Sequence, residues 1–490
     1  MKKHLLIWLL LPQTFIAVAQ PIIPINLQSG AVISLPVGAA PNALAIADYN
    51  QDNRPDIAVC QRGLNSVGVY LQAATGIFPS SPAGTYPAGQ APSGLVAVPL
   101  GRAPARPDID LVAISGPSNQ YTLLTNNKDG TGLFTPVGNA NNANYFGQAT
   151  GLVRPQLLAR DLDGDGWIDF AYTQDPAPPF TVPAGAYSQR LTSPTTVDLA
   201  TSANGFRANY RPSSLALADF DRDGIVDVVT TNPDGNEFTV VFASNGGNGQ
   251  PGWRVPALTL RLPSAGTRPV FVATGDVNGD LLPDIALAHE GSAEITIFLN
   301  SRNFSFGAAA SYPLSAAPRQ VLLQDLNGDR LTDMLVLTAD NKLQVFQHTG
   351  ASGVGRYGTP IVLAAGVDPV TLQVADVDGD YVADVVVGCA GDNTVRVFLN
   401  RSGVLSARAP QLAGVEVYPN PTHGYVTVQR AATVRGVLNA TFFDAVGRTV
   451  HQMDIAAPTT AVPLDNLQPG VYVLRLSTAE GVLNQRLVVD

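Results

Sequence analysis

Asp161-Leu162-Asp163-Gly164-Asp165-Gly166-Trp167-Ile168-Asp169 is the stretch that decides the fold, because it places four carboxylates at positions 1, 3, 5 and 9 of one short loop. A Ca²⁺ ion takes about six to eight oxygen ligands, and a tight loop can offer these side chains together with the backbone carbonyl of position 7. Gly164 and Gly166 favour the bend, since glycine adopts positive φ without steric cost. The spacing predicts a calcium-binding loop.

Five further loops repeat this spacing along the chain. Each has Asp at positions 1, 5 and 9, Asp or Asn at position 3, and a residue at position 7 that would bind through its carbonyl oxygen. The expected ligands are Asp48, Asn50, Asp52, Arg54 and Asp56; Asp161, Asp163, Asp165, Trp167 and Asp169; Asp219, Asp221, Asp223, Ile225 and Asp227; Asp276, Asn278, Asp280, Leu282 and Asp284; Asp325, Asn327, Asp329, Leu331 and Asp333; and Asp376, Asp378, Asp380, Val382 and Asp384.

One more unit keeps the strands of the repeat but has lost the loop. Val98-Pro99-Leu100-Gly101-Arg102 stands where acidic residues are expected, and Arg106 to Leu111 preserves only the end of the loop. We expect no ion there. With this unit, successive loops start about 50 to 60 residues apart.

The composition agrees with a repeat of short strands. The chain has 490 residues, too many for one ordinary core, and it is rich in Gly (46) and Pro (38) but has only 14% charged residues. Four short strands at a period of this size indicate a β-propeller blade, and seven units predict a closed ring. Ala31 to Leu35 would supply the outer strand of the seventh blade, so both ends would meet in one blade and leave no open edge.

The repeats resemble the FG-GAP or VCBS family, which includes the heads of integrin α-subunits and bacterial propellers. The resemblance covers residues 30–408, with six loops that match the metal motif of the family. It implies an all-β fold, a seven-bladed β-propeller, with calcium loops on one face and ligands on the other. The EF-hand alternative is poor, because no helices flank the loops and no Glu follows at position 12.

The calcium ions are expected to be mainly structural. The six loops hold 21 of the 39 acidic residues, and each packs three or four like charges together, which is unfavourable without a cation. About six Ca²⁺ ions would offset the net charge, which is -10 for the whole chain and -12 once Lys2 and Lys3 are removed with a signal peptide. This acidic balance argues against a nucleic-acid partner.

Four arginines lie beside the prolines that restart the blades: Arg154, Arg211, Arg268 and Arg319. We expect them to line one side of the ring's mouth and to favour an anionic ligand such as an acidic glycan, since guanidinium groups pair well with carboxylates. The alternative is that they are exposed arginines that make contacts between blades. The ligand itself is not identified by the sequence.

Binding or adhesion is expected rather than catalysis. The sequence shows no nucleophile elbow, zinc signature or phosphate loop, and His289 reads as a structural residue at a strand end. The alternative is a carbohydrate-active enzyme, for example a polysaccharide lyase, on the same scaffold. Cys60 and Cys389 are the two cysteines; they would lie in neighbouring blades, and the sequence leaves open whether they form a disulfide.

Both ends of the chain indicate export. Residues 1–19 read as a signal peptide, and no later segment has the length to span a bilayer. Residues 413–490, with Tyr418-Pro419-Asn420-Pro421 and Gly470 to Leu474, resemble the C-terminal sorting domain of type IX (Por) secretion, although the final Asp490 departs from the basic residue common in that family.

The resemblance at the C-terminus implies a small immunoglobulin-like β-sandwich, the type IX secretion machinery as a partner, and a secreted protein or one displayed on the bacterial cell surface. The alternative is a permanent adhesive module.

Overall fold

The computed structural model describes residues 23–99, 109–115, 120–137, 156–160, 162, 168–173, 185–187, 189–191, 199–201, 212–245, 251–253, 257–262, 267–301, 305–350, 357–380, 382–402, 415–418, 422, 424–431, 434, 438–443, 449–464, 467, 470–478 and 481–489. The chain divides into two compact units, residues 1–403 and 404–490. Within the described ranges, no helix is both long enough and apolar enough to cross a membrane. The predicted signal peptide lies outside these residues.

The strands that follow the loops are deeply buried in the first unit. Seven of the described strands begin with the aspartate at the end of a loop, or with its counterpart Asp110. One is β11 (Asp169–Tyr172), and the other six are buried along their whole length: β3 (Asp56–Gln61), β7 (Asp110–Ser115), β16 (Asp227–Asn232), β22 (Asp284–His289), β26 (Asp333–Thr338) and β30 (Asp384–Cys389). Their nearly continuous apolar sequence fits strands that have both faces covered.

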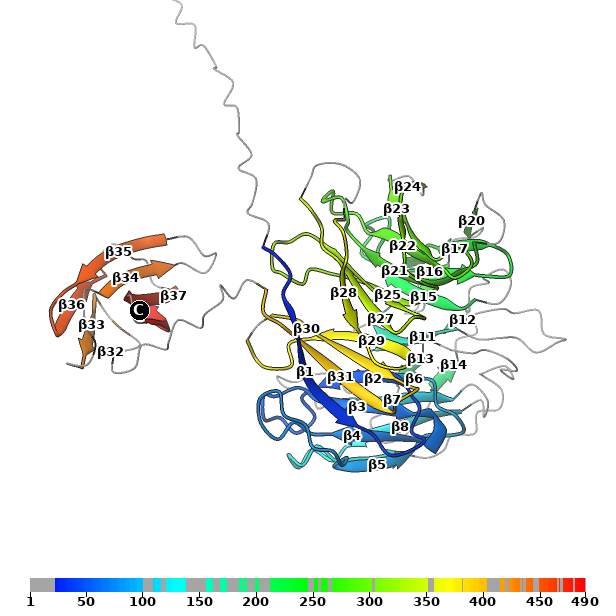
Figure 1. Cartoon of the computed structure of the whole chain (residues 1–490), viewed down its shortest axis with the longest axis horizontal. Coiled ribbons are helices and arrows are strands. Elements are labelled where there is room, and N and C mark those ends of the chain that lie inside the picture. Colours follow the sequence, from blue (N-terminus) through cyan, green and yellow to red (C-terminus); the bar gives the residue numbers. More distant parts are fainter. Residues whose placement is uncertain are drawn as a thin grey trace, which may run out of the picture. The chain divides into compact units, whose positions relative to one another are not determined.

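Each of these strands is the second strand of an antiparallel sheet in the first unit (Figure 1). The sheets are β2 (Pro41–Ala47), β3, β4 (Ser66–Tyr70) and β5 (Gly84–Pro87); β6 (Gly94–Val98), β7, β8 (Gln120–Asn126) and β9 (Phe134–Val137); β10 (Leu157–Arg160), β11 (Asp169–Tyr172) and β12 (Gly185–Tyr187); β15 (Ser214–Ala218), β16, β17 (Glu237–Val241) and β20 (Leu258–Arg261); β21 (Pro269–Gly275), β22, β23 (Glu294–Asn300) and β24 (Phe306–Pro313); β25 (Pro318–Gln324), β26, β27 (Lys342–Phe346) and β28 (Ile361–Ala364); and β29 (Pro369–Ala375), β30, β31 (Thr394–Asn400) and β1 (Leu27–Ser34).

Smaller elements lie outside these sheets. Two short hairpins are formed by β13 (Gln189–Leu191) with β14 (Leu199–Thr201) and by β18 (Ala243–Asn245) with β19 (Pro251–Trp253), and a 3₁₀ turn, η1, spans Arg62–Leu64.

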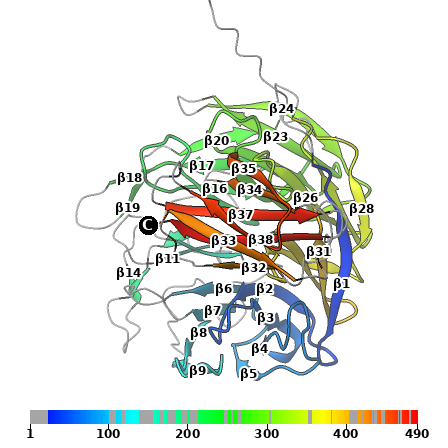
Figure 2. The ribbon, with the colours of Figure 1, turned by 90° about the vertical axis from the view of Figure 1, so that its left-hand side faces the viewer.

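The predicted closure of the last sheet by the N-terminus is confirmed. β1 pairs antiparallel with β31, with Ile33 opposite Val395 and Ser34 opposite Thr394. The blue β1 therefore forms the outer strand of a sheet whose other strands come from the end of the unit (Figure 2). The strand is longer than the predicted Ala31 to Leu35, because it begins at Leu27.

The cores of the first unit lie between consecutive sheets. One hydrophobic cluster contains Ile57 and Val59 of the first sheet together with Val386 and Val397 of the last sheet, so the two ends of the sheet series pack against each other. The other described clusters of this unit each combine residues of two sheets that are neighbours in sequence order. The apolar faces of the strands are thus buried by the next sheet.

Proline marks the start of the first strand in several sheets. Pro41, Pro269, Pro318 and Pro369 each begin such a strand, and the pairing register shifts within the next two residues. Proline cannot donate to the ladder, so it is tolerated at a strand start or a bulge. The restarting prolines of the sequence therefore mark the first strands correctly.

The second unit consists of two antiparallel sheets in its described residues. One has the order β32 (Val415–Tyr418), β33 (Tyr425–Arg430) and β36 (Thr459–Pro463); the other has the order β35 (Thr449–Ile455), β34 (Leu438–Phe443), β37 (Gly470–Thr478) and β38 (Gly481–Val489). One cluster, which includes Val428, Phe442 and Leu474, draws on both sheets. The unit therefore has a core of its own.

Candidate metal loops and central cavity

The backbone of the described loops is bent as the glycines predicted. Positions 4 and 6 have positive φ whether or not they are glycine: Gly279 has φ 80° and Leu281 has φ 67° in one loop, and Gly328 and Arg330 have 74° and 67° in the next. The bend directs backbone N–H groups at the carboxylate of position 1. In the loop of β16, Asp219 accepts from the amides of Asp223 at 3.2 Å and Gly224 at 2.9 Å.

Two of the described loops bring carboxylate oxygens together closely enough for a metal ion. The ligand atoms of Asp219, Asp221 and Asp227 all lie within 4.8 Å of one another, and so do those of Asp376, Asp378 and Asp384. Both loops have Asp at position 3. An all-oxygen donor set of this kind fits a hard cation such as Ca²⁺ better than zinc or copper.

Three described loops have Asn at position 3, and their geometry follows the same plan. The side-chain amides of Asn50, Asn278 and Asn327 donate to the position 5 aspartates Asp52, Asp280 and Asp329 at 2.9, 3.1 and 2.9 Å. In the first loop, Arg54 at position 7 also forms an ion pair with Asp52.

Most of the loop from Asp161 to Asp169 lies outside the described residues. Asp161, Asp163, Asp165 and Trp167 do not lie among the described residues, and Asp169 is described only as the first residue of β11. Its predicted role as a metal site stays a prediction.

The aspartate at position 9 has a second role that the sequence did not reveal. Asp227 is fully buried, and its two oxygens accept the amides of Phe220 at 2.8 Å and Ala243 at 2.7 Å. The same pair of bonds, from position 2 of the loop and from the end of the third strand, is made by Asp56, Asp284, Asp333 and Asp384. This carboxylate therefore ties the loop to its own sheet.

Asp110 shows that the aspartate at position 9 can join its own sheet without a metal-binding loop. Its unit has lost the acidic loop, yet Asp110 is buried and accepts the amide of Asn126 at 2.8 Å. The structural role of the aspartate thus survives where the other acidic ligands are missing.

Burial of the position 9 carboxyls changes their acidity. Desolvation raises the pKa of Asp227, Asp284 and Asp333 to about 7 and the pKa of Asp56 and Asp384 to about 6, against the opposing effect of the amides that donate to them. The neighbouring aspartates of each loop raise these pKa values further. A divalent cation beside these groups would favour their ionised form.

A series of buried side chains links each loop to the next sheet. The amides of Asn126, Asn300 and Asn400 donate to the carbonyl oxygens of Tyr49, Phe220 and Leu326, which are the second residues of the preceding loops, at 2.8, 2.8 and 2.6 Å. His348 contacts Val277 in the same way at 3.2 Å, and Gln72 of the first sheet donates to Val377 of the last at 2.8 Å. The sequence carried a signal for these links, because each of the three asparagines follows the aspartate at the end of its loop by sixteen residues.

A cavity of about 430 Å³ lies where the first strands of the sheets converge. Its described lining includes Asn42, Gln156, Phe271 and Gln320, from four different sheets. It continues into a second space of about 470 Å³, which shares Gln156 and Phe271 with it. This space is lined by β2, β6, β10, β15, β21, β25 and β29, the first strands of the larger described sheets of the first unit. The centre of the first unit is therefore hollow and lined by amide, hydroxyl and apolar side chains.

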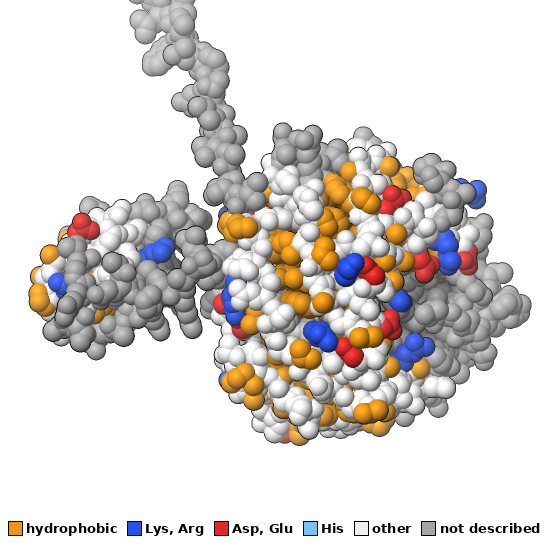
Figure 3. Space-filling view, viewed as in Figure 1, with side chains coloured by type: hydrophobic (Ala, Val, Ile, Leu, Met, Phe, Trp, Pro, Cys, Tyr) orange, Lys and Arg blue, Asp and Glu red, His pale blue; other side chains and the backbone are white. Residues whose placement is uncertain are grey.

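Two of the four arginines predicted to bind a ligand lie at this cavity. Arg268 and Arg319 both line it, close to Asp234 and Glu290. Arg268 lies 3.6 Å from a carboxylate oxygen of Glu290, and Arg319 lies 3.3 Å from one of Asp368. Arg154 and Arg211 lie outside the described residues. On the face of the first unit seen in Figure 3, basic and acidic side chains lie next to each other in several places.

The two cysteines and His289 are buried and contact only neighbouring strands and turns in the described residues. Cys60 and Cys389 are buried free thiols whose sulfur atoms face the carbonyl oxygens of Gly94 and Ala365, and burial raises the pKa of both thiols. His289 is buried at the end of β22, as its position in the sequence predicted, with Nε2 3.0 Å from the hydroxyl of Thr296.

Comparison with known families identifies both units. The FG-GAP-like repeat matches residues 161–230, 219–287, 276–336 and 325–387, and the secretion system C-terminal sorting domain matches residues 416–490. No curated protein is detectably similar to the chain in sequence.

Several solved structures match the chain at low sequence identity. A chain in the crystal structure of BBS1N in complex with ARL6DN matches with a TM-score of 0.50 and 9% identity, over 76% of this chain and 96% of that chain. The periplasmic gluconolactonase PpgL of Pseudomonas aeruginosa matches with a TM-score of 0.46 and 14% identity, over 66% and 85% of the two chains. PorZ, a surface component of the type IX secretion system of Porphyromonas gingivalis, matches with a TM-score of 0.34 and 14% identity, over 91% and 65%.

The sorting domain marks proteins that the type IX system secretes to the cell surface or the extracellular space, and it implies contact with that machinery. The chain is thus a secreted β-propeller protein of FG-GAP-like repeats that ends in a type IX secretion C-terminal sorting domain.

Proposed function

We propose that the first unit is a seven-bladed, calcium-binding propeller that works outside the cell as a ligand-binding or adhesion module for glycan or extracellular matrix material. The observation that carries this proposal is the central cavity, where Arg268 and Arg319 lie beside amide and hydroxyl side chains. Such a lining offers both charge and hydrogen bonds to a polar, anionic ligand.

The blade count is supported by how the sheets pack. The described sheets of this unit bury their cores against the sheet before and the sheet after, and the last packs on the first. A closed ring accounts for this arrangement, because each blade then covers the faces of two neighbours. For the second unit we propose an immunoglobulin-like sandwich, supported by two antiparallel sheets around one core.

Calcium as the cation is supported by the donor atoms. The two acidic clusters offer carboxylate oxygens only, and FG-GAP-like repeats commonly bind calcium. We propose about six calcium sites, mainly structural, because the position 9 carboxylate of each described acidic loop also joins that loop to its sheet.

We propose binding rather than catalysis at the cavity. Of the carboxylates that line its described part, Glu290 pairs with Arg268, an arrangement that holds the carboxylate as a partner for a cation. A general acid or base would instead have to face the substrate, whereas this carboxylate faces a guanidinium group.

A glycan array tests this function. The mature protein would be applied with CaCl₂ and with EGTA, beside the double variant Arg268→Gln and Arg319→Gln. A matched control is Arg261→Gln, since Arg261 is exposed, pairs with Glu237 and does not line the cavity.

We expect binding to acidic glycans in calcium, a loss of at least about tenfold in the double variant, and no loss in the control. Absence of binding to every glycan, or equal binding by the double variant, would contradict the proposal.

A further inference from the structure

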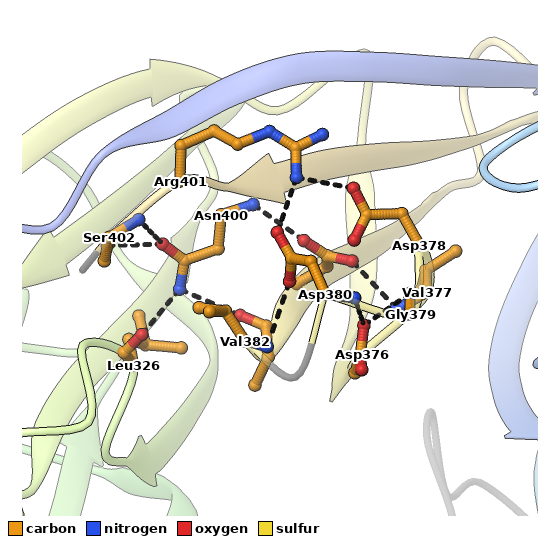
Figure 4. A network of polar contacts seen from close by, with 12 residues as sticks. Leu326, Asp376, Val377, Asp378, Gly379, Asp380, Val382, Asn400, Arg401 and Ser402 are labelled. Atoms are coloured by element: carbon orange, nitrogen blue, oxygen red, sulfur yellow. Dashed lines mark hydrogen bonds and ion pairs between the residues drawn. The ribbon is translucent and has the colours of Figure 1, made fainter. Parts of the chain in front are cut away.

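Arg401 makes an unusual contact with the acidic loop at residues 376–384, called the seventh loop because it precedes β30 of the seventh sheet (Figure 4). Its Nη1 lies 2.5 Å from Oδ2 of Asp378 and 2.7 Å from Oδ2 of Asp380, so one guanidinium nitrogen bridges positions 3 and 5. The three side chains are 30%, 9% and 25% exposed, so this contact is more buried than an ordinary surface ion pair. Arg401 comes directly after β31 and is not part of the loop.

The arrangement leaves one oxygen of Asp378 ready for a ligand. Asp378 Oδ1 is buried and has no hydrogen-bond partner among the described residues, whereas Oδ2 is held by Arg401. A buried carboxylate oxygen without a partner is unfavourable, and a cation at the cluster of Asp376, Asp378 and Asp384 would satisfy it. Arg401 therefore orients Asp378 from the side opposite the free oxygen, as an outer partner of a metal ligand does.

The backbone of the same residue holds the N-terminal segment. The amide of Arg401 donates to the carbonyl oxygen of Asn26 at 2.7 Å, and the amide of Asn26 donates to Oγ of Ser402 at 2.9 Å. Asn26 directly precedes β1, the strand that completes the last sheet. One residue thus contacts both the acidic loop and the point where the two ends of the first unit meet.

We propose that Arg401 is a positioning residue that couples cation binding in the seventh loop to docking of the N-terminal residues 23–26. The inference rests on the calcium binding proposed above. A cation fixes Asp378 and Asp380, which fix the guanidinium and with it the backbone amide that anchors Asn26. Since coupling is reciprocal, docking of residues 23–26 raises the affinity of this loop for the cation by the same factor.

Hydrogen exchange of the full mature chain, with CaCl₂ as the probe, tests the coupling. In the unaltered protein, calcium is expected to slow exchange of the Asn26 and Arg401 amides by about tenfold, within the usual range of coupling between sites. Arg401→Gln removes the bridge and Asp378→Asn removes a ligand, so both are expected to lose most of this effect. Arg401→Lys keeps the charge and one donor nitrogen on a shorter side chain, and an intermediate effect is expected.

Two control variants separate this coupling from a general effect of calcium. Arg261→Gln removes one exposed positive charge of β20, outside the acidic loops, and Asp221→Asn removes a ligand from the loop of β16. Both are expected to keep the calcium effect at Asn26 and Arg401. An unchanged effect in Arg401→Gln would overturn the inference while leaving calcium binding intact. Failure of calcium to bind at all, measured by titration calorimetry, would overturn the proposed function as well.

Discussion

The side-chain amide of Asn400 donates a 2.6 Å hydrogen bond to the carbonyl oxygen of Leu326, which belongs to the acidic loop of the preceding sheet. The same amide donates to Ala383 at 2.9 Å, and the backbone amide of Asn400 donates to Asp384 at 2.7 Å. Asn400 is fully buried. One side chain therefore joins two loops that are far apart in the sequence.

Asn400→Ala is expected to lower the free energy of unfolding by about 2 to 4 kcal/mol, because the buried carbonyl oxygen of Leu326 and the half-buried one of Ala383 both lose this donor. Chemical denaturation in saturating CaCl₂ measures this change. Gln28→Ala, at an exposed position of β1, is the matched control and is expected to stay within about 0.5 kcal/mol of the unaltered protein. An effect of Asn400→Ala no larger than that of the control would show that the link does not stabilise the fold.

Asp110→Ala and Asp227→Ala separate the structural role of position 9 from the metal role. Each leaves at least one buried amide unpaired, at a cost of about 1 to 3 kcal/mol. Asp110→Ala is expected to lower the melting temperature equally in CaCl₂ and in EGTA. Asp227→Ala is expected to lower the melting temperature more in CaCl₂ than in EGTA. In CaCl₂ the variant also loses the stability that one bound ion supplies, which is about 1.4 kcal/mol at tenfold excess over the Kd. Equal behaviour of the two variants would contradict a metal role for Asp227.

Acid destabilisation at His289 follows from its burial. Desolvation lowers the pKa of His289 to about 4, and the charge of Glu294 opposes this only in part. A depressed pKa means that the folded protein keeps His289 neutral, whereas the unfolded chain binds a proton there more readily. The contribution of His289 to the free energy of unfolding is therefore complete above pH 6.5 and is lost as the pH falls toward 4. The loss is at most about 3 kcal/mol.

The test compares the unaltered protein with His289→Gln by denaturation in EGTA between pH 7 and pH 4. The carboxyls of the loops titrate in both proteins, so the difference in stability isolates His289. We expect the free energy of unfolding of the variant to rise relative to that of the unaltered protein as the pH falls. A constant difference across this range would contradict the assigned burial of a neutral imidazole.

The repeat and its register could be predicted from the sequence because they rest on local chemistry. An aspartate at a fixed spacing, a restarting proline and an apolar run of six residues each have a direct physical meaning, and the pairing of β1 with β31 followed from counting the units. The second use of Asp227 could not be predicted in this way, since its partner Ala243 donates through the backbone and leaves no mark in the sequence.

The contacts of the predicted ligand arginines also depended on tertiary structure. That Arg268 faces Glu290 and Arg319 faces Asp368 depends on how the turns of neighbouring sheets meet. Arg401 was missed for the same reason, because it lies outside the loop that it contacts. By contrast, the sixteen-residue offset that places Asn126, Asn300 and Asn400 was visible in the sequence and could have been used.

The central claim is that calcium ions hold the propeller together, and thermal melting of the purified mature protein in CaCl₂ and in EGTA tests it most directly. At tenfold excess over Kd each site supplies about 1.4 kcal/mol, and six sites supply about 8 kcal/mol, which is comparable with the stability of an ordinary domain. We predict a melting temperature lower by more than about 10 °C in EGTA, restored when calcium is added back. A melting curve that is the same in CaCl₂ and in EGTA would contradict the account.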